Sequence, residues 1–588
     1  MGCLPFGSGV RLKSRLRWYS VRLTLRSSPL SWSGGRGPFS PTEGGRALPS
    51  SFASLVDSFL KEEYDDSPTL ASSLGLTEYD ERLDDVSEPA IRARIDADNA
   101  WLGRFRSVAD DGLSAAERID RDLLVSVLRG RQITQPLEMW RRQPATYLNP
   151  GLNGVFSLFL HRLRPERELA EAAAARLAQV PRNIADGIAN LDLLRTPRVY
   201  LERAVGQARA AAKYARELVP AEVKEPAAKQ RLLEAGAKAA SAFEEFAAFL
   251  DQRKADAKGD YAVGEETYSA LLREKEMLPF GTRELREKGR EQWDLLSVEA
   301  NRIAKEIDGG TWQETCERLN KIHAPTPEGM RQEYEEWTEK ARAFLRNTGL
   351  VTLPKGEMCT VEPSPPFQRP ILAVASYNRP PAFKDTLHGH FFVPFPPDGT
   401  PPEEVQKRLE GNCSAGIPTT AVHEAYPGHH WHLVMAKLNP SPVRRVYGTP
   451  YFNEGWGLYA ERVMREQGFF TDPKHLLYQY EATIFRAARI VVDTSLHMNE
   501  MTFDDAVKHM VEKGNLTEPN ARAEVGRYCS WPTQASSYLT GMLEIIDIRT
   551  RWLAKRGASD RPALRAFHDA LTGAGMLPTS LAEKAIAS

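Results

Sequence analysis

The chain has little cysteine, and its few cysteines are not arranged as a framework. Their number is odd and they are scattered, at Cys3, Cys316, Cys359, Cys413 and Cys529. No two of them are spaced as CxxC, which argues against a thiolate zinc site. Isolated cysteines of this kind are typical of free thiols in a reducing compartment rather than of disulfides.

The sequence also lacks an excess of charge and any long apolar run. With 77 Lys and Arg against 78 Asp and Glu, the formal net charge is −1, so no global field favours nucleic acid or an anionic membrane. No apolar run reaches about 18 residues, and we therefore expect no membrane span. The length of 588 residues and the hydrophobic content of 42% predict a globular protein of more than one packed unit, with no signal of oligomeric state.

Acidic residues are missing from the first part of the chain. None precedes Glu43, whereas basic residues are interspersed with serine and glycine at Arg11, Lys13, Arg15, Arg17, Arg22, Arg26 and Arg36. This composition is that of an organellar transit peptide, or else of a disordered or misassigned leader. We interpret residues 1–48 as a basic leader and expect the protein in the cytoplasm, or in an organelle matrix if the leader is a transit peptide.

A helical pattern without a fixed-period repeat fills residues 49–348. Apolar residues recur at i, i+3, i+4 and i+7 in the ranges 91–108, 114–131, 166–180, 182–194, 198–218 and 227–254, which indicates amphipathic helices. Prolines such as Pro181 and Pro220 are expected to separate them. We predict a helical body over 49–348.

Residues 349–588 begin with a proline-rich stretch that excludes long helices. Short apolar runs at 371–377 and 390–395 predict strands, with a weaker third strand at 358–361. Helical patterns return at 419–436, 453–466, 476–499, 503–513, 530–554 and 560–571. The predicted fold class is mainly α, with a small ribbon or sheet, and residues 349–588 are predicted to be the catalytic half.

The densest group of potential metal ligands is His-Glu-Ala-Tyr-Pro-Gly-His-His at residues 423–430. A standard HExxH helix places two imidazoles one turn apart, but here the second is displaced by two residues. In an unbroken helix His423 and His429 would point about 240° apart, and His430 would lie about 10.5 Å along the axis. Pro427 and Gly428 are expected to form a bulge that returns one imidazole to His423. We predict His429 as the second ligand, with His430 as the alternative.

A second motif, Asn-Glu-Gly-Trp-Gly-Leu-Tyr-Ala-Glu at residues 453–461, supplies carboxylates. We predict that Glu454 completes a site in which His423, His429 and Glu454 hold one Zn²⁺ per chain and leave one position open. Glu461 is expected to accept a hydrogen bond from a ligand imidazole. Glu424 is the predicted general base, which polarises the metal-activated water and passes its proton to the leaving amine.

The two motifs, HEAYPGHH and NEGWGLYAE, resemble those of a widespread family long catalogued as a domain of unknown function and grouped with the zincin metallopeptidases. The second is also similar to the Asn-Glu-Gly-aromatic stretch of gluzincin aminopeptidases, whose Glu is the third zinc ligand, which supports Glu454. The resemblance covers about residues 51–552. It implies a large helical zincin-like metallopeptidase fold, with the small sheet beside the metal-site helix, and a metal-dependent peptidase.

Zincins also need a donor for the oxyanion that forms on the scissile carbonyl. Tyr528, Tyr538, Arg527 and His497 are the candidates because they lie in late segments that match the family. Each has an alternative structural interpretation, such as a pairing of His497 with Asp493 one turn earlier.

Two arginines and the ribbon also have two interpretations each. Arg486 and Arg489 either neutralise carboxylates or grip the carboxy terminus of a substrate. The strand at 371–377 either presents an edge to an extended peptide or is a plain hairpin. His388 and His390 are expected to be packing or surface residues.

The sequence thus predicts a zinc-dependent peptidase that hydrolyses peptide bonds of peptide substrates. Two alternatives remain open. One is a metal-dependent hydrolase of a non-peptide amide or ester, and the other is a zincin-fold binding protein that has lost catalysis.

Overall fold

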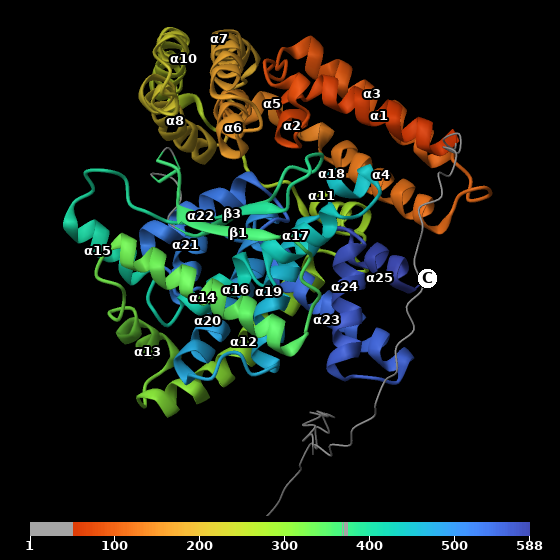
Figure 1. Cartoon of the computed structure of the whole chain (residues 1–588). Helices are drawn as coiled ribbons and strands as arrows, with labels where there is room; N and C mark the ends of the chain where they lie inside the picture. The colour runs from red at the N-terminus through yellow and green to blue at the C-terminus, as the bar shows by residue number, and fades with distance from the viewer. Residues whose placement is uncertain (1–50, 367, 370–373, 588) are drawn as a thin grey trace, which may run out of the picture. The chain divides into compact units, whose positions relative to one another are not determined.

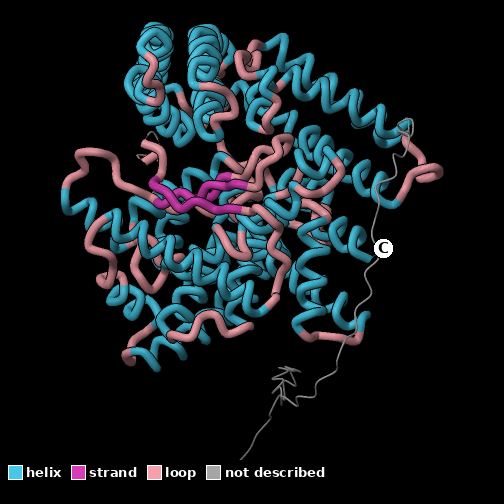
Figure 2. Tube along the Cα trace, in the orientation of Figure 1, coloured by secondary structure: helices cyan, strands magenta, loops and turns pink. Residues whose placement is uncertain are grey.

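The structure, a computed structural model, describes residues 51–366, 368–369 and 374–587. The predicted leader, 1–48, lies outside these residues. Helices make up most of the described chain, and one small sheet accompanies them (Figures 1 and 2), which confirms the mainly α fold class. Among the described helices, none combines the length and apolar character that a membrane crossing requires.

The first helices begin the body, and α3 packs against α4 there. They are α1 (Ser51–Asp66), α2 (Pro68–Ser73), α3 (Glu88–Ser107), α4 (Ala115–Thr134) and α5 (Met139–Arg142). The start of α4 follows from local chemistry: the Ser114 hydroxyl accepts the Glu117 N–H, and the Glu117 carboxylate accepts the Ser114 N–H. This reciprocal pair satisfies two backbone donors that a helix leaves open.

The next group of helices has its own apolar core. It consists of α6 (Ala145–His161), α7 (Glu166–Asn190), α8 (Arg198–Lys213), α9 (Val219–Ala221) and α10 (Pro226–Gln252). Figure 1 shows α7, α8 and α10 side by side. The predicted break at Pro181 is wrong, because α7 runs through it. Val180 and Ile184 on either side are buried in the same core, and this packing outweighs the hydrogen bond that proline removes.

The remaining helices surround the sheet and carry both motifs. They are α11 (Glu265–Ala270), α12 (Thr282–Ile307), α13 (Trp312–Leu319), α14 (Pro327–Thr348), α15 (Pro402–Glu410), α16 (Ile417–Glu424), α17 (His429–Lys437), α18 (Pro442–Val446), α19 (Pro450–Glu466), α20 (Pro473–His497), α21 (Phe503–Glu512), α22 (Glu518–Ser530), α23 (Ser537–Arg556), α24 (Arg561–Gly573) and α25 (Thr579–Ala587). The single helix predicted at 419–436 is therefore two helices, and the one predicted at 530–554 begins only at Ser537.

Three short strands form the sheet, in the order β1-β3-β2. They are β1 (Met358–Pro363), β2 (Ser376–Asn378) and β3 (His388–Val393). The central strand β3 runs parallel to β1 and antiparallel to β2, so β1, predicted as the weakest strand, is as long as the central one. Residues 371–373 of the predicted strand 371–377 lie outside the described residues. Tyr377 of β2 contacts His430 of α17, which places the sheet beside the motif helix.

The main apolar core joins early and late helices. Phe59 of α1 and Leu124 of α4 belong to the same buried cluster as Trp431 of α17 and Trp456 of α19. The predicted boundary at 349 coincides with the end of α14, where Gly349 adopts a φ of 62°. The helices that carry the motifs are thus fixed by apolar packing from both predicted halves.

Candidate metal centre

Residues 425–428 separate α16 from α17 and turn the chain between the two motif histidines. The Gly428 N–H donates to the carbonyl of Val422 (3.0 Å), and the Trp431 N–H donates to that of Ala425 (3.2 Å). A Cβ atom on Gly428 would lie 1.9 Å from the His423 carbonyl oxygen, so only glycine fits there. The predicted bulge within one helix is therefore a complete break between two helices, made possible because Pro427 has no N–H to leave unpaired.

Helix α19 lies against this break and explains the spacing of the second motif. The indole of Trp456 donates to the carbonyl of Pro427 (2.8 Å). A Cβ atom on Gly457 would lie 2.6 Å from the His423 ring, so the absence of a side chain leaves room for the imidazole. Glu454 and Glu461 occupy turns of the same helix on either side of this contact.

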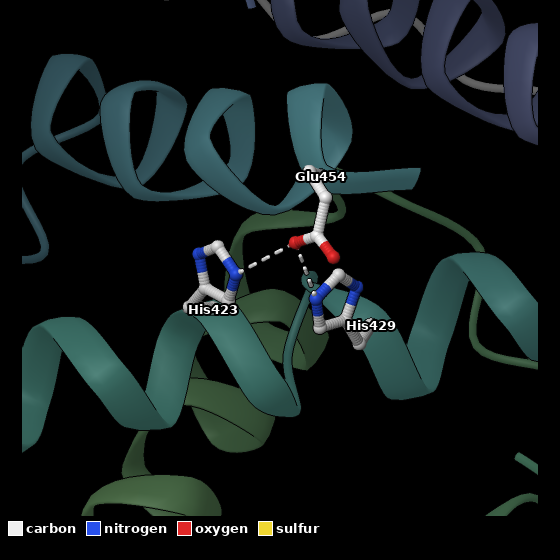
Figure 3. Close-up of side chains that lie close together, drawn as sticks. All are labelled: His423, His429 and Glu454. Atoms are coloured by element: carbon white, nitrogen blue, oxygen red, sulfur yellow. Dashed lines mark ion pairs between the residues drawn. The ribbon is translucent and has the colours of Figure 1, made fainter. Parts of the chain in front are cut away.

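The break brings His423, His429 and Glu454 together, as Figure 3 shows. One potential ligand atom from each lies within 4.8 Å of the others. Glu454 Oε2 is 3.7 Å from His423 Nε2 and 3.4 Å from His429 Nε2. Two donors on one tetrahedral zinc are about 3.4 Å apart. The three side chains therefore have the donor types and the spacing of a three-ligand metal site.

Glu461 orients the first imidazole. It is 1% exposed, and its Oε1 accepts a hydrogen bond from His423 Nδ1 at 2.7 Å. Because a carboxylate only accepts, Nδ1 carries a proton, and Nε2 is the ring nitrogen that faces Glu454. Burial lowers the pKa of His423, but Glu454 and Glu461 outweigh it and raise that pKa to about 9. Burial likewise opposes ionisation of Glu454, while His423 and His429 hold its pKa well below the usual range.

His430 of the first motif and the nearby His432 face elsewhere. His430 is fully buried; its Nε2–H donates to Glu357 and its Nδ1 accepts from the Tyr377 hydroxyl, both at 2.9 Å. His432 Nε2 contacts the side-chain oxygen of Asn453 at 3.0 Å. Both ring nitrogens of His430 are thus engaged away from Glu454, and the structure brings His429 rather than His430 to His423.

Glu424, the predicted general base, ends α16 beside the three-ligand cluster. It is 9% exposed, and no hydrogen bond or ion pair joins its carboxylate to another residue that the structure describes. Burial raises the pKa of Glu424, although His429, His423 and Arg486 oppose that rise. A buried carboxylate without a partner and with a raised pKa is suited to accept and release a proton.

The four predicted oxyanion donors occupy different places. Arg527 forms an ion pair with Glu524 at 2.9 Å. The Tyr538 ring stacks on that of His423, with centroids 6.5 Å apart. The Tyr528 hydroxyl donates to Glu524 (2.7 Å) and accepts from Arg489 (3.0 Å). His497 contacts the Tyr528 carbonyl (3.0 Å) and faces Asp493 at 3.6 Å. Only Tyr538 among them contacts a residue of the cluster within the described chain.

His388 and His390 have structural partners on the sheet. His388 contacts Thr360 and His390 contacts Glu362, each at 2.6 Å between β3 and β1. These are the packing positions that the alternation along the strand predicts.

Sequence reasoning missed Glu357, which receives hydrogen bonds from His430, Tyr426 and Arg342. It precedes β1 and stands far from the motif in sequence, so no spacing signal marks it. The role of Gly457 was also missed, although a glycine within a helical pattern is a signal of close approach.

Residues 68–586 match the family model described as "Bacterial protein of unknown function (DUF885)". No curated protein matches the chain.

Two solved structures share its fold. One, described as a "putative lipoprotein of unknown function" from Shewanella oneidensis, has 20% identity and a TM-score of 0.74 and covers 92% of this chain and 100% of its own. Another, described as a "putative lipoprotein" from Colwellia psychrerythraea, has 19% identity and a TM-score of 0.78. The match covers 91% of this chain and 98% of the other. At such identities the likeness concerns the fold. The family match, by contrast, spans most of the chain, and the protein therefore belongs to the family of bacterial proteins of unknown function DUF885.

Proposed function

We propose that the protein is a metal-dependent peptidase of the zincin type, which hydrolyses peptide bonds with one Zn²⁺ per chain. The observation that carries this proposal is the convergence of His423, His429 and Glu454 within 4.8 Å beside the buried carboxylate of Glu424, which has no hydrogen-bond partner among the described residues. Two imidazoles, one carboxylate and a neighbouring acid are the donor set of catalytic zinc sites in peptidases.

The chemistry of the three ligands fits a borderline-soft divalent cation. Neutral imidazole and carboxylate both suit Zn²⁺, and three protein ligands leave a position open. When bound, the cation would polarise the substrate carbonyl and lower the pKa of water. Glu461 holds the His423 ring through Nδ1 and turns Nε2 toward Glu454, which is the usual arrangement behind a zinc-binding histidine.

Glu424 has the proton-transfer role. Its carboxylate takes a proton from the attacking water and passes it to the leaving amine, so it ends the cycle as it began. Its burial supports this role, because burial raises the pKa of Glu424 and so favours the protonated form that the cycle requires. The Tyr538 hydroxyl, on the ring that stacks against His423, would donate to the oxygen on which negative charge develops.

The decisive experiment compares Glu424→Gln with the wild type, after both are loaded with zinc. We expect the variant to keep its zinc, measured by elemental analysis, and to lose about 10²- to 10⁴-fold in peptide cleavage, because general base catalysis contributes that factor. The readout is mass-spectrometric analysis of a mixed peptide library.

Two controls define the outcome. Glu512→Gln, at the exposed end of α21, removes a carboxylate of the same type and should leave cleavage unchanged. A chelator should abolish wild-type cleavage and added Zn²⁺ should restore it. Equal cleavage by Glu424→Gln and wild type would contradict the proposed mechanism.

A further inference from the structure

Beside the metal centre, α20 and α22 surround one tyrosine ring with arginines. The guanidinium carbon of Arg489 lies 4.7 Å from the centroid of the Tyr538 ring, and that of Arg486 lies 5.6 Å from it. Arg527 reaches the same place through Gln534, whose side chain accepts a bond from Arg527 and donates to the Tyr538 hydroxyl at 3.3 Å. Tyr538 therefore connects these cations with His423.

The positive charge of this group exceeds its paired negative charge. Glu524 is within ion-pair distance of Arg489 (2.7 Å) and of Arg527 (2.9 Å). Among the described residues, no carboxylate lies within that distance of Arg486, whose Nη1 donates to the Ala482 carbonyl of its own helix at 3.1 Å. Glu424 and Glu481 act on Arg486 only at longer range. A guanidinium held in partly buried surroundings without a counter-ion is costly, which calls for an anionic ligand.

Unused donors point to where that anion would bind. Arg489 is 7% exposed, yet its Nη1 has no hydrogen-bond partner in the described chain, and neither does the buried Nε of Arg486. Arg486, Arg527 and Tyr538 are only half-buried, so the group is not sealed from solvent. Free guanidinium donors at the edge of a buried cluster are suited to bind a carboxylate through paired hydrogen bonds.

We propose that Arg486 and Arg489 bind the free carboxy-terminal carboxylate of a peptide substrate. The inference rests on the proposed peptidase function and adds to it a mode of cleavage. Arg489 lies 4.7 Å from the Tyr538 ring, and that ring lies 6.5 Å from the His423 ring, so the anion site is within about three extended residues of the metal ligands. The enzyme is thus a carboxypeptidase, which releases short fragments from the end of a chain.

The test uses the zinc-loaded, full-length protein and one peptide in two forms, as a free acid and as a carboxy-terminal amide. We expect the wild type to prefer the free acid by about 10- to 100-fold in kcat/KM, which is the value of hydrogen bonds to a charged group. In Arg486→Gln the ratio of kcat/KM for the free acid to that for the amide should fall toward one. The change should come from a lower kcat/KM for the free acid. Lys474→Gln, on the exposed start of the same helix, is the matched control and should keep the ratio.

A second variant separates binding from folding. Arg489→Lys keeps the charge opposite Glu524 but removes the planar guanidinium. It should also bring the acid-to-amide ratio of kcat/KM closer to one. Circular dichroism reports whether the fold is retained. Equal cleavage of both peptides by the wild type, or an unchanged ratio in a folded Arg486→Gln protein, would overturn the proposal.

Failure of the peptidase function gives a different result. In that case the zinc-loaded wild type cleaves neither peptide, and calorimetric binding of the same two peptides decides the matter. If the wild type binds the free-acid peptide more tightly than the amide, and Arg486→Gln loses this preference, the carboxylate site is supported without catalysis. Equal binding of the free-acid and amide peptides by the wild type would reject the carboxylate site.

Discussion

Two regions of the molecule bury arginine in opposite ways. In the region α6–α10, Arg176 of α7 is fully buried, and its guanidinium donates to the carbonyls of Arg82, Tyr79 and Gly154. In the region α16–α23, Arg489 of α20 is buried as well, but one of its terminal nitrogens has no partner among the described residues. The first arrangement satisfies the buried charge with hydrogen bonds, as a structural role requires, and the second leaves binding capacity unused.

The same contrast extends to the neighbours of these arginines. The core of α6–α10 consists of alanines and large apolar side chains such as Phe243 and Leu177. In the region α16–α23, buried atoms without a partner include His429 Nδ1 and Glu461 Oε2. Buried polar groups without partners reduce stability. Among the described residues, such atoms are more numerous in this region than in α6–α10, where Asp186 and Glu225 carry them.

The largest effect that we expect distinguishes two adjacent histidines of α17. His429→Ala removes one of three predicted ligands and should weaken zinc binding by about 10²- to 10⁴-fold, roughly a third of the binding free energy of a structural zinc. His430→Ala should retain zinc but lower the free energy of unfolding by about 1–3 kcal/mol, because Glu357 loses a hydrogen bond in a buried place. Zinc titration and denaturant unfolding measure the two. The reverse pattern would exchange the roles of the two residues.

The next effect tests whether α6–α10 acts only through stability. Phe243 of α10 is 1% exposed in that region's core, so Phe243→Ala should lower the free energy of unfolding by about 3–5 kcal/mol. Zinc affinity should be unchanged at temperatures where the variant is folded, because no described contact joins Phe243 to the metal ligands. Urea unfolding and zinc titration of the same preparation provide the comparison. A loss of zinc affinity in the folded variant would mean that the two regions are coupled.

The smallest effect concerns pH and the carboxylate behind His430. Burial opposes ionisation of Glu357, but hydrogen bonds from His430, Tyr426 and Arg342 outweigh it and lower the pKa to about 2. A pKa depressed in the folded state stabilises the protein above the unfolded value of 4.5, and this stabilisation is lost as the pH falls from 4.5 to 2. Glu357→Gln should therefore be less stable than wild type by about 1–3 kcal/mol at pH 7.

Denaturant unfolding from pH 7 to pH 3 tests this expectation. The difference in the free energy of unfolding between wild type and Glu357→Gln should become smaller below pH 4.5. A difference that is independent of pH would exclude the ionisation of Glu357 as its source. Glu362→Gln serves as the control, because Glu362 is a half-buried carboxylate on β1 that also contacts a histidine, His390.

The sequence predicted helices better than it predicted where they end. Amphipathic periodicity located α3, α4, α10, α19 and α20, and the range predicted for α4 began at Ser114, the residue that caps this helix in the structure. Pro181 was wrongly expected to end a helix, since local chemistry does not include the packing of Val180 and Ile184 on both sides of it. Apolar runs located β1 and β3, but among the described residues the strand predicted at 371–377 overlaps β2 only at Ser376 and Tyr377. The parallel pairing of β1 with β3 depends on contacts between residues some thirty positions apart.

By itself, the sequence determined the inventory of the site: imidazoles near residue 423, carboxylates at Glu424, Glu454 and Glu461, and a Pro-Gly pair between them. The tertiary structure alone decided which imidazole joins them. Rotation at the break sends His429 toward Glu454 and His430 toward Glu357, and the choice depends on partners that are distant in sequence. The physical reason is that spacing along a chain fixes direction only while a helix is continuous; once Gly428 interrupts it, the packing of α19 and the sheet sets the direction instead.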